Sequence, residues 1–239
     1  MTPFWNPRNL TVVTLLAVVY FTMGKLGLML AFVHVSATAV WPPAGIALAA
    51  LLLLGYRVWP GIFFGAFLVN ITTAGTVLTT LGIATGNTLE GVMGAYLINR
   101  FAHGRRVFDR PHDIFLFAIL AGLVSTTIGA TLGATSLALG NVANWANYSS
   151  IWVTWWLGDA AGALLVAPLL VLWAENSRLR WHAGQIIEAA FLLMCSVLVG
   201  LVVFGGLLQT DVKTYPLDYL CVPILVWAAI RFDRRAAAP

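Results

Sequence analysis

Residues 41–70, with the sequence WPPAGIALAALLLLGYRVWPGIFFGAFLVN, constrain the fold of this chain more than any other segment. Two apolar runs each open with a Trp-Pro step, and a single charge, Arg57, lies in the turn GYRV between them. Proline suits the first turn of a helix, where its missing N–H would be unpaired anyway. Tryptophan suits the edge of a bilayer, because its ring is apolar with one polar N–H. The segment therefore predicts two membrane helices joined by a tight hairpin.

The composition extends this prediction to the whole chain. Hydrophobic residues make up 60% of it and charged residues only 9%, with a mean hydropathy of +0.89, whereas soluble domains carry about 25% charged residues. Because a bilayer core of about 30 Å needs about 20 apolar residues per helix, we predict an all-α, polytopic bundle embedded in membrane lipids. Its spans, about eight in number, are expected at residues 10–31, 37–54, 58–74, 78–99, 113–139, 151–173, 185–208 and 216–230.

The basic residues predict the orientation of the bundle. With a cytoplasmic N-terminus, eleven of the thirteen Lys and Arg residues fall in cytoplasmic segments; Lys213 falls outside, and Lys25 lies within the first span. By the positive-inside rule, both termini are expected in the cytoplasm. The same distribution accounts for the net charge of +4, so nucleic acid is not expected as a partner.

The sequence gives no pattern typical of a metal, a cofactor or an enzyme. Cys195 and Cys221 lie inside apolar runs, and the four histidines are scattered without metal-ligand spacing. The segment LGD at residues 157–159 is weakly similar to intramembrane aspartyl proteases. That resemblance would require the motif Gly-x-Gly-Asp and a second mid-membrane aspartate, so we expect no catalytic residues.

Polar residues inside the predicted spans are the candidates for a functional site, because ionisable groups within a membrane tend to face the bundle interior. Glu90 shares a helix face with Gly82, Gly86 and Gly94, and such a face lets another backbone come close. Gly158 and Gly162 flank Asp159 in the same way. The expected ligand-binding or switch residues are Lys25, Asn70, Asn87, Glu90 and Asp159.

These residues allow alternative interpretations. Glu90 and Asp159 are expected at comparable depths, where they form either a ligand cavity or a structural clasp between helices. Lys25 either pairs with one of them or extends outward to the membrane interface. The tryptophans of residues 152–156 are expected at an outer aromatic rim. We expect a cavity below this rim that opens outward and binds a small polar or amphipathic ligand.

Three further blocks repeat a known pattern: GKLGL at residues 24–28, GNTLEGVMGAYL at 86–97 and WVTWWLGDAAGALLVAPLLVLW at 152–173. With residues 41–70, they make the chain resemble the MASE-type membrane-associated sensor domains of the first type. The resemblance supports the five polar residues as pattern positions without assigning them a ligand. It also implies structural roles for Trp41, Pro42, Pro43, Gly45, Trp156, Gly158 and Pro168.

The family precedes bacterial histidine kinases and diguanylate cyclases, and this implies the function. Residues 1–239 would form a single sensor domain, either a fragment or a short relative, with an output domain beyond residue 239. It would perceive a small-molecule or membrane-protein signal and relay it in cis to a cytoplasmic kinase or cyclase, in two-component or cyclic di-GMP signalling, as a homodimer. The alternative is a small-molecule transporter or transporter-like binding protein, which uptake assays in vesicles would distinguish.

The predicted topology can be tested with reporter fusions. Because eleven of the thirteen basic residues fall on one side, fusions after Arg105, Arg180 and Arg235 should report the cytoplasm. Fusions near Ala143 and Asp211 should report the periplasm. A periplasmic signal after Arg235 would contradict an even number of spans.

Overall fold

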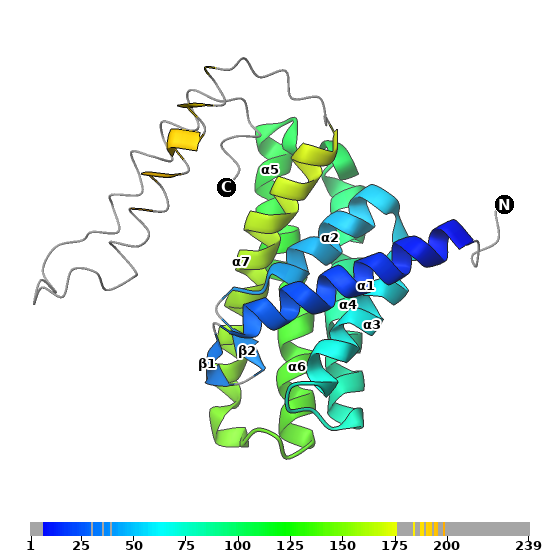
Figure 1. The fold of residues 1–239 in the computed structure, drawn as a ribbon. Helices are drawn as coiled ribbons and strands as arrows, with labels where there is room; N and C mark the ends of the chain where they lie inside the picture. The colour runs from blue at the N-terminus through cyan, green and yellow to red at the C-terminus, as the bar shows by residue number, and fades with distance from the viewer. Residues whose placement is uncertain are drawn as a thin grey trace, which may run out of the picture. The chain divides into compact units, whose positions relative to one another are not determined.

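The computed structural model describes residues 7–29, 31–34, 36–38 and 40–175, together with scattered positions between 184 and 198. The chain divides into two units, Met1–Ala174 and Glu175–Pro239, and the first of them contains the helical bundle (Figure 1). The longer elements of the bundle are α1 (Pro7–Leu28), α2 (Pro42–Leu54), α3 (Trp59–Ile71), α4 (Val77–Phe101), α5 (Pro111–Phe117), α6 (Thr126–Leu139) and α7 (Tyr148–Glu175).

Among the described residues, three helical segments are long and apolar enough to cross a membrane: Pro7–Leu28, Pro111–Leu139 and Trp145–Ala174. They correspond to the first, fifth and sixth predicted spans. α4, at the fourth, has 25 residues and a length of about 38 Å. A helix thus lies at each of the first six predicted spans. The seventh and eighth fall largely outside the described residues, so a count of eight remains a prediction.

The short helix α2 lies among other helices. With 13 residues it is about 20 Å long, well below the thickness of a bilayer core. Nine of its residues are buried, and it contacts α1, α3 and α4. Because neighbouring helices surround it, its length does not have to match the bilayer.

The second predicted span, 37–54, begins too early, and the prediction of an all-α fold needs a small correction. β1 (Ala31–His34) pairs antiparallel with β2 (Ala37–Thr38), and α2 starts only at Pro42, with prolines in its first turn. The residue before a proline is sterically disfavoured in the helical region, and Trp41 has φ −117° and ψ 83°. The chain therefore stays extended up to Trp41.

The fifth predicted span is helical throughout but contains a wider turn. Between α5 and α6, the segment Ala118–Val124 is π-helical, and the Ser125 amide donates to the Leu120 carbonyl, five residues back, at 3.0 Å. Such turns recur at functional sites in other proteins. The helix ends at Leu139, before Gly140.

Hydroxyl groups within the spans mostly bond to their own helix. Thr88 donates to the Ala84 carbonyl at 2.7 Å, and Ser125 donates to the Ala121 carbonyl at 2.9 Å. These bonds satisfy polar side chains where lipid offers no partner. A buried hydroxyl without such a bond is therefore informative.

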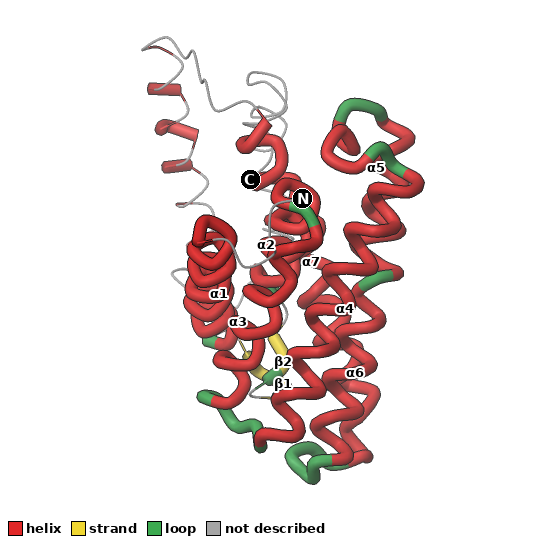
Figure 2. The backbone as a smooth tube through the Cα atoms, turned by 90° about the vertical axis from the view of Figure 1, so that its right-hand side faces the viewer, coloured by secondary structure: helices red, strands yellow, loops and turns green. Residues whose placement is uncertain are grey.

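The predicted glycine face of α4 packs against α6, and the two helices lie side by side in Figure 2. A Cβ atom at Gly86 would lie 2.8 Å from the Cβ of Leu132, and one at Gly94 would lie 2.9 Å from Ser125 Oγ. At Gly82 it would overlap the hydroxyl of Ser136. The absence of side chains therefore sets the distance between α4 and α6.

α2 and α7 also meet at glycines. A Cβ atom at Gly45 would overlap the Gly162 carbonyl oxygen, and one at Gly162 would overlap the Trp41 carbonyl oxygen. The Trp41 amide donates to the Gly158 carbonyl at 2.9 Å. Three of the predicted motif positions, Trp41, Gly45 and Gly158, thus join the start of α2 to α7.

Substituting Gly45 should weaken the fold. In Gly45→Ala, the new methyl group would overlap the α7 backbone and lie 2.7 Å from the Cβ of Val166, so we expect a loss of about 1–3 kcal/mol in the free energy of unfolding in detergent micelles. Gly91→Ala is the control, because its methyl group meets only the flexible end of Leu51, at 3.1 Å. Equal stability of both variants would contradict the close approach of α2 and α7.

Candidate functional site

Glu90 on α4 and Asp159 on α7 meet at Gly129 of α6. A Cβ atom at Gly129 would overlap Glu90 Oε2 and lie 3.0 Å from Asp159 Oδ2. The two carboxyl groups interact electrostatically, and both are buried, with exposures of 5% for Glu90 and 0% for Asp159. The acidic pair (Glu90 and Asp159) therefore forms where three helices converge.

Proton sharing determines whether this contact is attractive. Two carboxylates so close repel each other unless a proton lies between them. Among the described residues, neither Glu90 nor Asp159 forms an ion pair with a basic side chain. The acidic pair thus depends on a proton or on a bound cation.

Lys25 was expected to be the counter-charge of the acidic pair, but its ammonium group is bonded elsewhere. Its ammonium group donates to the Thr72 carbonyl at 2.9 Å and to Thr73 Oγ1 at 2.8 Å. These atoms follow the C-terminal end of α3, where exposed carbonyls and the helix dipole favour a cation. The long aliphatic stem lets the ammonium reach that end. This position resembles the alternative in which Lys25 extends outward instead of pairing with an acid.

Asn87 connects α4 to α1 beside the acidic pair. Its amide nitrogen donates to the Tyr20 hydroxyl at 3.1 Å, while its Oδ1 atom is buried without a hydrogen-bond partner. Tyr20 is 1% exposed and its ring packs edge-on against Trp41, with 6.4 Å between ring centroids. Sequence analysis missed Tyr20, although it lies four residues before Gly24 on the same helix face.

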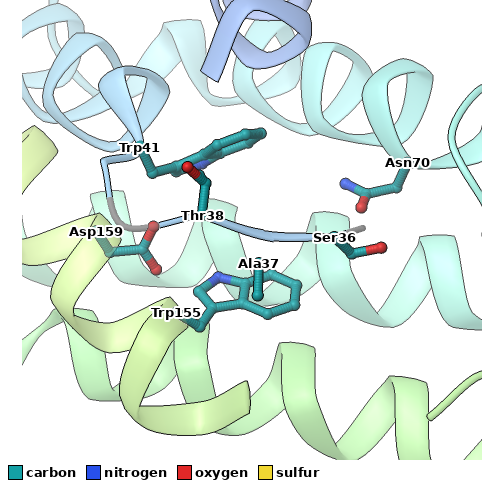
Figure 3. Close-up of a pocket in the computed structure, with 7 residues that line it drawn as sticks. All are labelled: Ser36, Ala37, Thr38, Trp41, Asn70, Trp155 and Asp159. Carbon is teal, nitrogen blue, oxygen red and sulfur yellow. The ribbon is translucent and has the colours of Figure 1, made fainter. Parts of the chain in front are cut away.

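A small cavity lies next to Asp159, with room of the order of one water molecule. In Figure 3, Asp159, Thr38 and Trp155 gather at one end, with Ser36 and Asn70 at the other. Asn70 is also tied to its own helix, since its Nδ2 donates to the Ala66 carbonyl at 2.9 Å. The lining residues are Ser36, Ala37, Thr38, Trp41, Asn70, Trp155 and Asp159.

The cavity includes only part of the predicted cluster. Asp159 and Asn70 line it, Glu90 touches Asp159 beside Gly129, and Asn87 lies near Tyr20. The β-hairpin contributes a wall that sequence analysis did not predict, because residues 37–38 were assigned to a helix. Gly129 was also missed, although the Gly-, Ser- and Thr-rich composition of the fifth span is a signal for close helix contact.

Trp155 was predicted at the outer aromatic rim, but its side chain is buried inside the bundle. It is 6% exposed, and a Cβ atom at Gly133 of α6 would lie 2.6 Å from its ring. Trp152 and Trp156 face another side of α7 and stack on each other at 5.9 Å. The Trp156 indole donates to the Leu123 carbonyl of the π-helical segment at 3.0 Å, which attaches α7 to that segment. Pro168 lies further along, inside α7.

Several buried polar side-chain atoms of the described bundle, most of them near the acidic pair, have no hydrogen-bond partner: the oxygens lack a donor, and the Trp41 indole N–H lacks an acceptor. Most buried polar atoms in proteins are paired, so this concentration indicates a place where a ligand binds or where packing changes. The unpaired atoms are Asp159 Oδ1 and Oδ2, Asn87 Oδ1, Thr38 Oγ1, Thr80 Oγ1 and Trp41 Nε1.

The fold and the site define an integral membrane helical domain with a buried acidic pair. The profile of the MASE1 family matches residues 11–239, and the chain belongs to this family of membrane-associated sensory domains. Neither the curated proteins nor the solved structures gave a match.

The partner of Lys25 can be identified with double-mutant cycles. Because its ammonium bonds Thr73, Lys25→Met and Thr73→Ala should be non-additive by about 0.5–1.5 kcal/mol in the free energy of unfolding. Lys25→Met and Asp159→Asn should be additive within about 0.5 kcal/mol. Stronger coupling to Asp159 than to Thr73 would show that Lys25 pairs with the acid.

Proposed function

We propose that this domain perceives a signal in or across the bacterial inner membrane and relays it to a histidine kinase or diguanylate cyclase on its C-terminal side, with the acidic pair as the switch. Membership in a family of membrane-associated sensory domains supports the sensory role. The observation that carries the proposed mechanism is the contact of Glu90 and Asp159 at Gly129.

The acidic pair gives the bundle two arrangements that differ in charge. With a shared proton the carboxyl groups attract each other and hold α4 against α7; without it they repel. A signal shifts the balance only if it binds one arrangement more tightly than the other. Such a signal would act by binding at the pair or by changing the packing of α4, α6 and α7 around it.

α7 is the element best placed to transmit the change. Asp159 follows Gly158, whose carbonyl accepts the Trp41 amide, so one side of α7 is bonded to the start of α2 at the site itself. From there α7 continues to Glu175, toward the side predicted to be cytoplasmic. A displacement at Asp159 would move the helix that leads to the output domain.

Membrane lipids and a second copy of the chain are the proposed neighbours of this domain. On α1, Leu15, Val18 and Leu26 are each more than 50% exposed, which suits contact with lipid tails. Kinases and cyclases of this type generally act as dimers, so we propose that the signal passes through a homodimer.

The proposal is tested in a fusion that carries the natural output domain. Glu90→Gln and Gly129→Ala should change output activity about fivefold or more per folded protein in the membrane, the effect of about 1 kcal/mol of coupling. The first variant removes a charge, and the second inserts a methyl group against Glu90 Oε2.

Gly91→Ala, next to Glu90 on the same helix, is the matched control and should leave output unchanged. A substitution of Trp152, which lies outside the cavity lining, should act more weakly than Glu90→Gln. If all variants lose output only in proportion to lost protein, the acidic pair is a structural clasp and the switch lies elsewhere.

A further inference from the structure

We infer that the cavity beside Asp159 binds one small monovalent cation, for which Na⁺ is the best match, through the Asp159 carboxylate and the Thr38 hydroxyl. The inference gives the proposed sensor its class of ligand, and its consequence for signalling rests on that proposed function. Binding to the isolated domain can be measured independently of it.

The unpaired oxygens point to a positively charged ligand. Asp159 is 0% exposed and Thr38 is 3% exposed, and neither Asp159 oxygen nor Thr38 Oγ1 has a hydrogen-bond partner. A buried polar atom without a partner is destabilising, and Figure 3 shows both residues lining the same cavity. Carboxylate and hydroxyl oxygens are hard ligands that suit cations of the alkali and alkaline-earth groups.

The charge around the cavity matches one monovalent cation. With one proton on the acidic pair, held by Glu90, Asp159 keeps one negative charge. The basic residue expected to neutralise it was Lys25, whose ammonium is bonded to Thr72 and Thr73 instead. A single bound monovalent cation would make the pair neutral, as an ionic group inside a membrane requires.

The size of the cavity excludes most other ligands. Room of about one water molecule is too small for a metabolite or a peptide. Mg²⁺ keeps several of its waters and Ca²⁺ takes six to eight oxygens, which this space does not hold. The described residues also contain no group of three or more His, Cys, Asp or Glu side chains, so the site lacks the ligands of a transition metal.

Two buried indoles line the site. Trp41 and Trp155 are 7% and 6% exposed and both line the cavity. Apolar rings lower the local dielectric, which strengthens the attraction between a cation and the carboxylate, and an aromatic face itself attracts a cation. The same rings give the site an intrinsic fluorescent signal.

The probe is Na⁺, titrated at constant ionic strength with choline against the full 239-residue chain in nanodiscs of phosphatidylethanolamine and phosphatidylglycerol. We expect saturable changes in tryptophan fluorescence and a melting temperature that rises with Na⁺ by mass action, with a weaker response to the larger K⁺. A water molecule that bridged the same oxygens would produce no response to Na⁺. Equal melting curves in Na⁺ and in choline would therefore overturn the inference.

Two variants and a matched control locate the site. Asp159→Asn should abolish the response, and Thr38→Val, which keeps the shape but removes the hydroxyl, should weaken Na⁺ binding about tenfold or more. Thr80→Val is the control, because Thr80 Oγ1 is also buried and unpaired but lies outside the cavity lining. If Asp159→Asn does not fold, wild-type affinity in Thr38→Val alone overturns the site.

The output of the fusion protein separates this inference from the proposed function. Na⁺ binding without any Na⁺-dependent output would leave the cation site intact and contradict its role in sensing. A change of output in Glu90→Gln, with no Na⁺ binding to the wild-type domain, would support the switch and overturn the cation site.

Discussion

The burial of two carboxyl groups among α4, α6 and α7 is the constraint on which the rest of the structure depends. Lipid offers no hydrogen bonds, so such groups must be enclosed by protein. The enclosure requires helices that approach one another closely, and Gly129 permits this at the acidic pair itself, because a methyl group there would overlap Glu90 Oε2. The glycine face of α4 continues the same close contact along α6.

The short helices and the β-hairpin follow from this arrangement. α2 is too short to cross a bilayer alone, but it is buried among other helices and contacts α7 through Gly45 and Gly162. The hairpin before it brings Thr38 and Trp41 to Asp159, and the hydrogen bond from Trp41 to Gly158 holds this wall in place. A bundle of long helices alone would leave the cavity without that wall.

A buried acidic pair suits a sensory domain because its stability depends on a proton or a cation, and either can be exchanged. An apolar contact of the same area would hold the helices together under all conditions. Two carboxyl groups hold together only when a proton or a cation accompanies them, and the helices that carry them respond as packed units. α7 links this point to the chain beyond Glu175.

The sequence by itself determined the membrane environment, the positions of the first six helices, the Trp-Pro start of α2 and the glycine face of α4. These features depend on local hydrophobicity, on proline stereochemistry and on the 3.6-residue period of a helix, all of which are encoded within a few neighbouring residues. The depths of Glu90 and Asp159 along their helices followed in the same way.

Only the tertiary structure decided which groups meet. Whether Lys25 reaches Asp159 or the end of α3 depends on how α1 is rotated and placed against α3, and Trp155 rather than Trp156 lines the cavity because of the rotation of α7 against α6. A periodic sequence pattern identifies which face of a helix is special. It does not determine how that helix is rotated in the bundle or which neighbouring helix contacts the face.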